Sequence, residues 1–283
     1  MAHAQTFQVR APFTQVTSGW GAVIPVMAAD ARAAQDRVES TALPSLLTAL
    51  ETLGSTPYRA EVVRVEDPDD PSVASWTPFQ PMGRFGAIRV EPLTSKRRAS
   101  LQRRFHALAT DETATAAAGH LRRGVTLGDL PDSTGATAQA ALLRYYMTIE
   151  RIAQAVTSAT RRERKGAIDR ERERIASELS EVLGTLPPPK QVAAIEEAGR
   201  SLRRAELRYA EIEVREAART LGLADAIADS AAKFAGFRGK YLGHSSQAPN
   251  DQVMQWLAGP ENRAFGLATA YLAGYLDRLP LPG

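Results

Sequence analysis

A short basic stretch near the C-terminus carries the residues that are best suited to chemistry. Residues 234–246 read FAGFRGKYLGHSS and place Arg238, Lys240 and His244 within seven positions. Arginine offers a permanently charged, planar group to phosphate oxygens, and histidine exchanges a proton near neutral pH. RNA cleavage without a metal ion needs a base for the ribose 2′-hydroxyl, an acid for the leaving 5′-oxygen and a cation for the pentavalent phosphorus. The stretch therefore indicates a candidate phosphate site.

The backbone must change direction for Arg238 and His244 to face one site. Residues six apart on an unbroken α-helix lie about 120° apart around its axis. Gly239 and Gly243 permit a local break that would bring the two side chains together. The structural alternative is a basic helix end, because cations are favoured at a helix C-terminus and His244 could cap exposed carbonyl groups there. The sequence leaves both interpretations open.

A predicted helix upstream supplies a carboxylate and two tyrosines. Within ALLRYYMTIERIAQAV one apolar face is expected, formed by Leu142, Tyr146, Ile149, Ile152 and Val156. Glu150 borders this face and could instead pair with a neighbouring arginine, Arg151 or Arg238. Tyr145 and Tyr146 are candidates for stacking on a substrate, with a place in the core or in an interface as the alternative.

These two segments resemble parts of HEPN domains. Arg238 and His244 enclose five residues and so match the R-x(4–6)-H motif of that family. ALLRYYMTIERI is similar to the early HEPN helix in which tyrosines precede a glutamate, and it puts Glu150 where several branches carry an acidic residue. The resemblance covers roughly residues 137 to 280. One departure is Gly239, since active members usually have a polar residue, often Asn, immediately after the motif arginine.

The resemblance implies an all-helical bundle and a metal-independent endoribonuclease of toxin, abortive-infection or CRISPR defence systems. It implies that His244 acts as general base or acid, that Arg238 holds the scissile phosphate with help from Lys240, and that Glu150 orients Arg238 or His244. Tyr145 is assigned to substrate binding. RNA is the implied substrate, a homodimer and a defence-system partner protein are the implied partners, and no cofactor or metal is expected. A degenerate bundle that serves as a scaffold, with Gly239 marking lost catalysis, is the alternative.

The first third of the chain has a different character. Strand-like runs are TFQVRAPF, GWGAVIPV, YRAEVVRV and FGAIRVEP, and residues 28–53 have helical spacing. Proline and aspartate punctuate the gaps, as in DPDDPSVASWTPFQP. This pattern predicts a small α+β domain over residues 1–93. The two-part layout suggests a sensor or targeting module.

A basic segment follows and is interpreted, with the Thr, Ala and Gly-rich stretch after it, as a linker over residues 94–136. Between residues 93 and 165 thirteen basic residues face six acidic ones. Such an excess can attract a polyanion, although charge runs are often only solvated faces. The strip considered for RNA or DNA binding consists of Lys96, Arg97, Arg98, Arg103 and Arg104. A nucleic-acid-binding regulator is therefore a third class of function.

The rest of the chain, residues 137–283, is predicted to form an antiparallel helical bundle. A helix over residues 168–184 is expected to end at PPP, because proline lacks the backbone N–H and clashes inside a helix. A long charged helix then runs to Leu221 with Gly222 as its C-cap, and Leu202, Ala205, Tyr209 and Ile212 form its apolar stripe. Helices over residues 224–237 and 261–279 complete the bundle.

The composition limits the classes of protein and of site that the chain can form. The chain has 283 residues, of which 44% are hydrophobic and 24% charged, as in ordinary globular proteins. It has no cysteine, which excludes disulfides, thiolate zinc sites and a cysteine nucleophile. The four histidines do not recur at metal-ligand spacing. Neither a secretory signal nor an apolar run of membrane-spanning length is visible, so a cytoplasmic location is expected.

Overall fold

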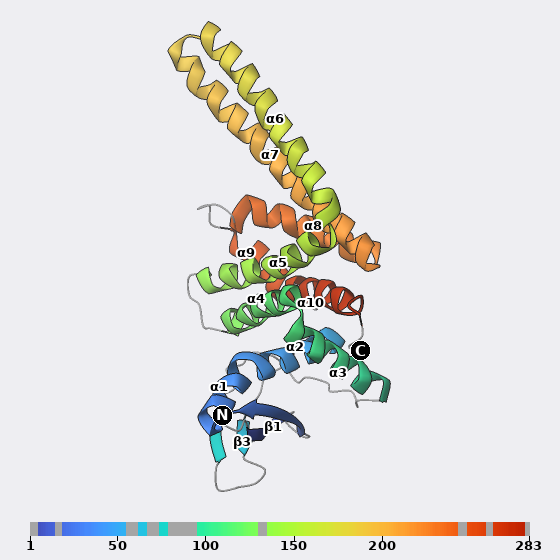
Figure 1. Cartoon of the computed structure of the whole chain (residues 1–283). Coiled ribbons are helices and arrows are strands. Elements are labelled where there is room, and N and C mark those ends of the chain that lie inside the picture. The colour runs from blue at the N-terminus through green and yellow to red at the C-terminus, as the bar shows by residue number, and fades with distance from the viewer. Residues whose placement is uncertain are drawn as a thin grey trace.

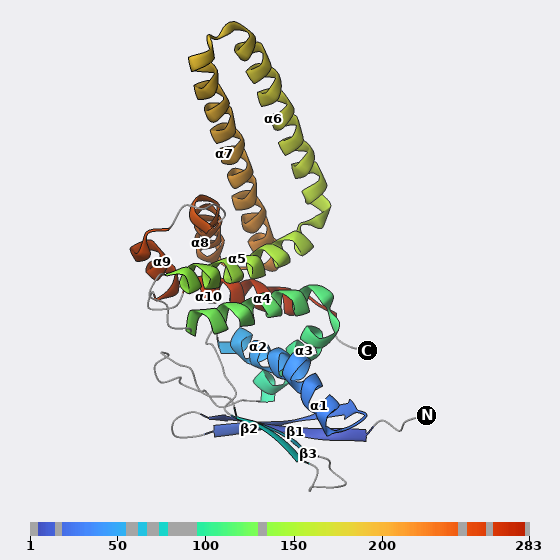
Figure 2. The same ribbon diagram turned by 90° about the vertical axis from the view of Figure 1, so that its left-hand side faces the viewer.

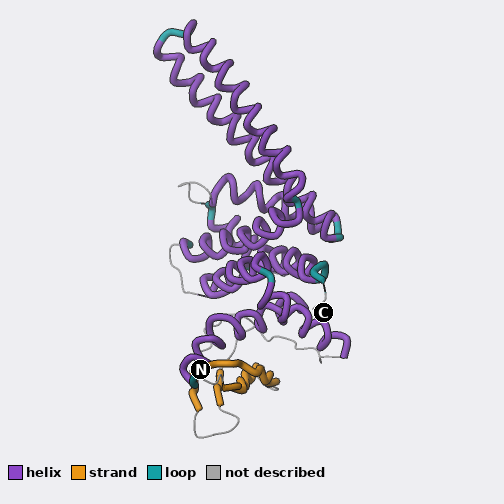
Figure 3. The backbone as a smooth tube through the Cα atoms, viewed as in Figure 1, coloured by secondary structure: helices purple, strands orange, loops and turns teal. Residues whose placement is uncertain are grey.

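The computed structural model describes residues 5–14, 19–54, 62–66, 74–78, 95–129, 135–242, 248–258 and 263–280. Most of them are helical, and the molecule is elongated (Figures 1 and 3). The strands lie at one end, a bundle of helices occupies the middle, and a helical hairpin projects from the other end. Within these ranges no helix combines the length and the apolar character that a membrane-spanning segment needs.

The strands form an antiparallel sheet in the order β2-β1-β3-β4. Their bounds are Gln5–Thr14 for β1, Gly19–Ala28 for β2, Val62–Glu66 for β3 and Ala74–Pro78 for β4. The first two pair along their whole length, from Gln5 opposite Ala28 to Thr14 opposite Gly19. β4 falls in a segment that sequence analysis treated as a gap, and the expected strand FGAIRVEP lies outside the described residues.

Helices α1 (Ala31–Arg37) and α2 (Leu43–Gly54) flank a π-helical turn, η1 (Val38–Ala42), and cover the sheet (Figure 2). The Asp30 side chain begins α1 by accepting a hydrogen bond from the backbone N–H of Ala33 at 2.8 Å. A small core here consists of Val26, Ala28, Ala34, Val38, Leu43, Leu46, Leu47 and Leu50. Ala49 of α2 belongs to the main core instead. A separate domain over residues 1–93 therefore stays a prediction.

The expected linker is wrong over residues 95–129, which form two packed helices. They are α3 (Ser95–Thr110) and α4 (Glu112–Asp129). Leu108, Leu121 and Val125 are almost completely buried in the main core. The alanines that made the segment look like a linker are good helix formers, and several are buried against neighbouring helices. The main core therefore begins before residue 137.

The main bundle surrounds α5 (Ala136–Val156), as predicted. Its other members are α8 (Asp225–Phe237), the π-helical turn η2 (Arg238–Leu242), α9 (Asn250–Leu257) and α10 (Arg263–Leu276), together with α4. Leu142, Tyr146, Ile149 and Ile152 are buried, which confirms the expected apolar face of α5, while Val156 is half-buried. α9 was not predicted. A mostly helical bundle is thus the central feature of the fold.

The projecting hairpin consists of α6 (Ser158–Thr185) and α7 (Pro188–Leu221) (Figure 2). Pro187 and Pro188 separate the two helices as expected, with Pro188 at the first position of α7, where no backbone N–H is needed. Gly222 ends α7 in the left-handed conformation, at φ +70°, and so confirms the predicted C-cap. α6 begins ten residues earlier than expected, directly after α5.

Candidate functional site

Arg238 is the first residue of the π-helical turn that continues α8. Helix α8 ends at Phe237, and η2 carries the chain from Arg238 to Leu242. A wider π turn re-aims side chains relative to an α-helix and is frequent at functional sites. The helix therefore widens at Gly239, whereas Gly243 lies outside the described residues, so the predicted break between Arg238 and His244 stays a prediction. His244 lies outside the described residues, so its distance from Arg238 stays untested.

The Arg238 guanidinium lies over the ring of Tyr146, a residue of α5. Its central carbon is 5.2 Å from the ring centroid, within the range of a cation–π interaction. Tyr146 is only 2% exposed, and its ring packs edge-on against Phe234 of α8 at a centroid distance of 5.9 Å. Phe234 in turn stacks near Trp256 of α9. The ring on which Arg238 lies is thus packed within the aromatic core.

Glu150 lies one helical turn beyond Tyr146 and completes this group. Burial raises the pKa of the Glu150 carboxyl, and the nearby Glu213 raises it further, while Arg238 and Arg161 oppose the shift. Burial and the Glu150 charge also raise the pKa of Tyr146. Glu150 is thus electrostatically coupled to the predicted phosphate-binding arginine. The alternative partner, Arg151, pairs instead with Glu112 at 3.5 Å.

Glu213 of α7 is a member of the group that sequence analysis missed. Its Oε1 accepts a hydrogen bond from the Thr157 hydroxyl at 3.3 Å. The same oxygen is 3.6 Å from Arg164 and 3.9 Å from Arg161, both on α6. These contacts tie the base of the hairpin to the surroundings of Glu150. Nothing in the local pattern of a highly charged helix distinguishes Glu213 from its neighbours, so only the packing reveals it.

Arg238 keeps hydrogen-bonding capacity that other arginines have used. Its Nε is buried and finds no hydrogen-bond partner among the described residues. Arg103 and Arg151 also have such an Nε, but their terminal nitrogens pair with Asp277 and Glu112. Arg238 forms no ion pair within the described part of the chain. That Nε has almost no accessible surface, so an oxyanion would have to bind the guanidinium through its terminal nitrogens.

Tyr145 cannot bind a substrate, and that prediction was wrong. It is 1% exposed and packs edge-on against Phe265 of α10 at 5.9 Å. Its ring also covers Gly124 of α4, where an added Cβ would lie 2.5 Å from a ring carbon. Positions 145 and 150 lie about 140° apart around a helix, whereas 146 and 150 lie about 40° apart. The helical spacing therefore favours Tyr146 as the tyrosine of the Glu150 face.

Lys240 is exposed on η2, two residues after Arg238. Its Nζ is 4.8 Å from the centroid of the Tyr241 ring. Its ammonium group is exposed and already lies over a ring of the same turn. Its predicted role as a substrate contact therefore stays a prediction.

Some residues of the basic strip on α3 form hydrogen bonds and ion pairs within the protein. Arg104 is 7% exposed, and its guanidinium donates to the Thr52 carbonyl at 2.6 Å and to Asp277 at 2.7 Å. Arg103 also pairs with Asp277, at 2.5 Å. These two arginines join α2, α3 and the end of α10. Lys96 is exposed, and the Arg98 side chain lies outside the described residues. The strip is therefore a weaker candidate for polyanion binding than its charge suggested.

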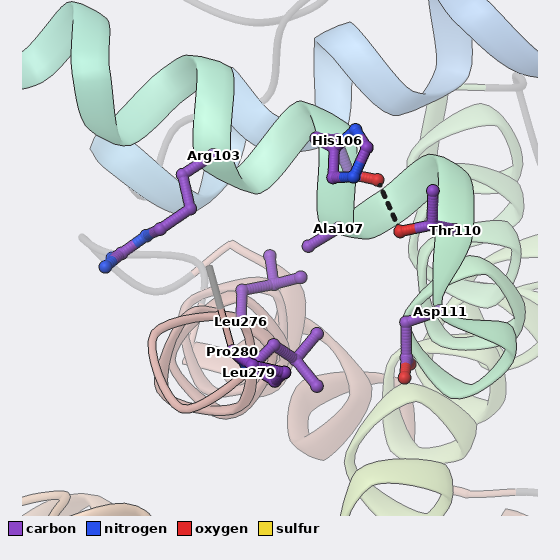
Figure 4. Close-up of a pocket in the computed structure, with 8 residues that line it drawn as sticks. All are labelled: Arg103, His106, Ala107, Thr110, Asp111, Leu276, Leu279 and Pro280. Carbon is purple, nitrogen blue, oxygen red and sulfur yellow. Dashed lines mark hydrogen bonds between the residues drawn. The ribbon is translucent and has the colours of Figure 1, made fainter. Parts of the chain in front are cut away.

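A cavity of about 270 Å³ lies beside this strip, between α3 and the end of α10 (Figure 4). Its lining comprises Arg103, His106, Ala107, Thr110, Asp111, Leu276, Leu279 and Pro280. The Thr110 hydroxyl donates to the His106 carbonyl at 2.9 Å and so stays within its own helix. None of the residues around Arg238 contributes to this lining. The cavity and the candidate phosphate site are thus separate features.

No protein-family model matches the chain, and no curated protein or solved structure is detectably similar to it. The likeness to HEPN domains therefore rests on the motif residues themselves. Because one fold can serve many functions, the group formed by Arg238, Tyr146 and Glu150 is the feature that bears on function.

Proposed function

We propose that the protein is a metal-independent endoribonuclease of the HEPN type. The observation that carries the proposal is Arg238, which lies over the Tyr146 ring near the half-buried Glu150 and has an Nε with no hydrogen-bond partner among the described residues. This is the arrangement expected of an arginine that receives an oxyanion. It lies six residues before His244, the one histidine of the motif.

In the proposed reaction Arg238 binds the scissile phosphate and neutralises the charge that develops on it. A base, His244 or a group it pairs with, removes the 2′-hydroxyl proton, and the 2′-oxygen attacks the phosphorus. The bond from phosphorus to the 5′-oxygen breaks, and that oxygen takes up a proton. The products are a 2′,3′-cyclic phosphate and a 5′-hydroxyl. Glu150 orients Arg238, and Lys240 contacts the flanking phosphate.

The proposed setting is a bacterial defence or toxin system in the cytoplasm. The N-terminal region with its sheet would act as the sensor or targeting module, and the bundle would act as the nuclease, in a homodimer and with a partner protein of the system. A regulator that binds nucleic acid through α3 is the weaker candidate, because Arg103 and Arg104 are held by Asp277.

The test is cleavage of labelled RNA, with analysis of the new ends. Wild-type protein should produce 2′,3′-cyclic phosphate and 5′-hydroxyl ends, and cleavage should persist in EDTA because the nucleophile is internal to the RNA. His244→Ala should lower the rate by about 10²- to 10⁴-fold, the usual effect of losing a positioned acid or base. Products with a 3′-hydroxyl, or undiminished cleavage by His244→Ala, would contradict the mechanism.

A further inference from the structure

The α6–α7 hairpin projects from the bundle without a neighbour along most of its length (Figures 1 and 2). Its helices have 28 and 34 residues, so they are about 42 and 51 Å long. Among the described side chains of residues 158–213, Ile175 alone is buried. Two helices touch along one line only, so the pair cannot enclose its own apolar residues. Val182, Val192, Ile195 and Ile212 accordingly remain exposed.

Apolar side chains form a stripe along α7 that is left uncovered. Val192 is 60% exposed, Ile195 51% and Ile212 42%, while Leu202 and Tyr209 are half-buried. The positions 192, 195, 202, 209 and 212 are symmetric about Leu202. If two copies of α7 lie antiparallel with Leu202 at the two-fold axis, Ile195 comes level with Tyr209 and Val192 with Ile212. Residues 195 and 209 lie about 20° from Leu202 around the helix, so the centre of the stripe matches itself in the antiparallel direction, while residues 192 and 212 lie about 80° to either side and flank it.

The charges of the hairpin favour the same direction. Residues 175–197, around the tip, carry four acidic residues and one basic residue. The base, residues 158–174 and 198–221, carries thirteen basic and eight acidic residues. An antiparallel pair places each acidic tip against the basic base of the other copy and brings Glu196 level with Arg208. A parallel pair would place like charges together, which is unfavourable.

One pair of like charges does meet in this register, since Arg200 comes level with Arg204. Both already lie close to carboxylates of their own helix. Arg200 contacts Glu197 at 2.8 Å and Glu196 at 3.9 Å, and Arg204 is 3.8 Å from Glu197. These contacts offset the repulsion that the pairing would otherwise create.

We infer that the hairpin is a self-association surface, on which the hairpin of a second copy packs antiparallel to form a four-helix bundle centred on Leu202. The apolar stripe then becomes buried in both copies at once, as a two-fold interface requires. This inference does not depend on the proposed RNA cleavage. An inactive protein would still associate in this way.

Sedimentation of matched variants tests the association. The wild-type chain at about 10 μM should sediment as a dimer, with twice the monomer mass of 30.6 kDa. Ile195→Glu should raise the dissociation constant at least tenfold. Ala193→Glu is the control, because residue 193 is also exposed but lies about 160° around the helix from residue 195. Circular dichroism of both variants should match the wild type. A wild-type monomer, a dimer that survives Ile195→Glu, or equal effects of both variants would overturn the inference.

Cross-linking tests the direction of packing, and the absence of native cysteines makes it specific. Leu202→Cys should form a disulfide with itself in the dimer, because residue 202 lies on the two-fold axis. Ile195→Cys should not, because two copies of residue 195 would lie about 21 Å apart along the bundle. Efficient disulfide formation by Ile195→Cys, or none by Leu202→Cys in a dimer of wild-type affinity, would overturn the antiparallel arrangement.

Discussion

Arg104 is buried and Arg238 is half-buried, and the two arginines have different partners. Arg104 is buried between α2, α3 and α10, and it donates to Asp277 and to the Thr52 carbonyl. The Arg238 guanidinium lies over the ring of Tyr146 and interacts electrostatically with Glu150. The Arg104 guanidinium joins elements of the fold, whereas the Nε of Arg238 has no hydrogen-bond partner among the described residues. The burial of a charged side chain therefore indicates its role only when its hydrogen-bond partners are also known.

The largest effect is expected at Arg238. Arg238→Ala should lower the rate of RNA cleavage by about 10²- to 10⁴-fold, because the developing charge on phosphorus loses its cation. The free energy of unfolding should change little, since Arg238 forms no ion pair with a described residue. Cleavage assays and urea unfolding measure the two quantities. A variant that unfolds but cleaves normally when folded would make Arg238 a structural residue like Arg104.

The opposite outcome is expected at Arg104. Arg104→Ala should lower the free energy of unfolding by about 2–3 kcal/mol, because the Thr52 carbonyl and Asp277 lose a charged donor. The part due to Asp277 is reduced by its exposure to solvent. Cleavage per folded molecule should be unchanged. A loss of RNA affinity with full stability would instead restore Arg104 to the basic strip.

Substitutions at two glycines of α4 test how tightly Tyr145 is packed in the core. Gly124→Ala should destabilise the protein by about 1–3 kcal/mol, because the new methyl group would meet the ring of Tyr145. Gly119 faces open space on the same helix, so Gly119→Ala should stabilise by about 0.5–1 kcal/mol. Thermal unfolding distinguishes the two. If both variants were equally stable, Tyr145 would not be a tightly packed core residue.

The pH dependence of stability tests the burial of Glu150. Because burial raises the pKa of this carboxyl in the folded protein, its contribution to stability is greatest below its ordinary value of 4.5 and is lost as the pH rises through the raised pKa. Glu150→Gln should therefore be more stable than the wild type at pH 7, and this advantage should vanish towards pH 4. Cleavage should fall, since the oriented carboxylate is gone. A variant less stable at pH 7 would mean that attraction to Arg238 outweighs burial.

Sequence patterns with a local cause predicted much of the helical part. The apolar face of α5, the proline break before α7 and the Gly222 cap depend on residues that are near one another in the chain. The role of Glu150 in orienting Arg238 or His244 was suggested by a family resemblance and stays a prediction; the Arg238 charge opposes the rise of the Glu150 pKa that burial causes.

Other features depended on contacts between distant segments. Arg104 meets Asp277 across 173 positions, and Thr157 meets Glu213 across 56, so no local pattern could reveal either contact. The alanine-rich stretch before residue 137 resembles a linker in sequence, but α5 and α10 cover it in the fold. Periodicity determines which residues share a helix face, because it depends only on the backbone. Which faces then meet depends on the packing of the whole chain, and that packing decided that Tyr146, and not Tyr145, supports Arg238.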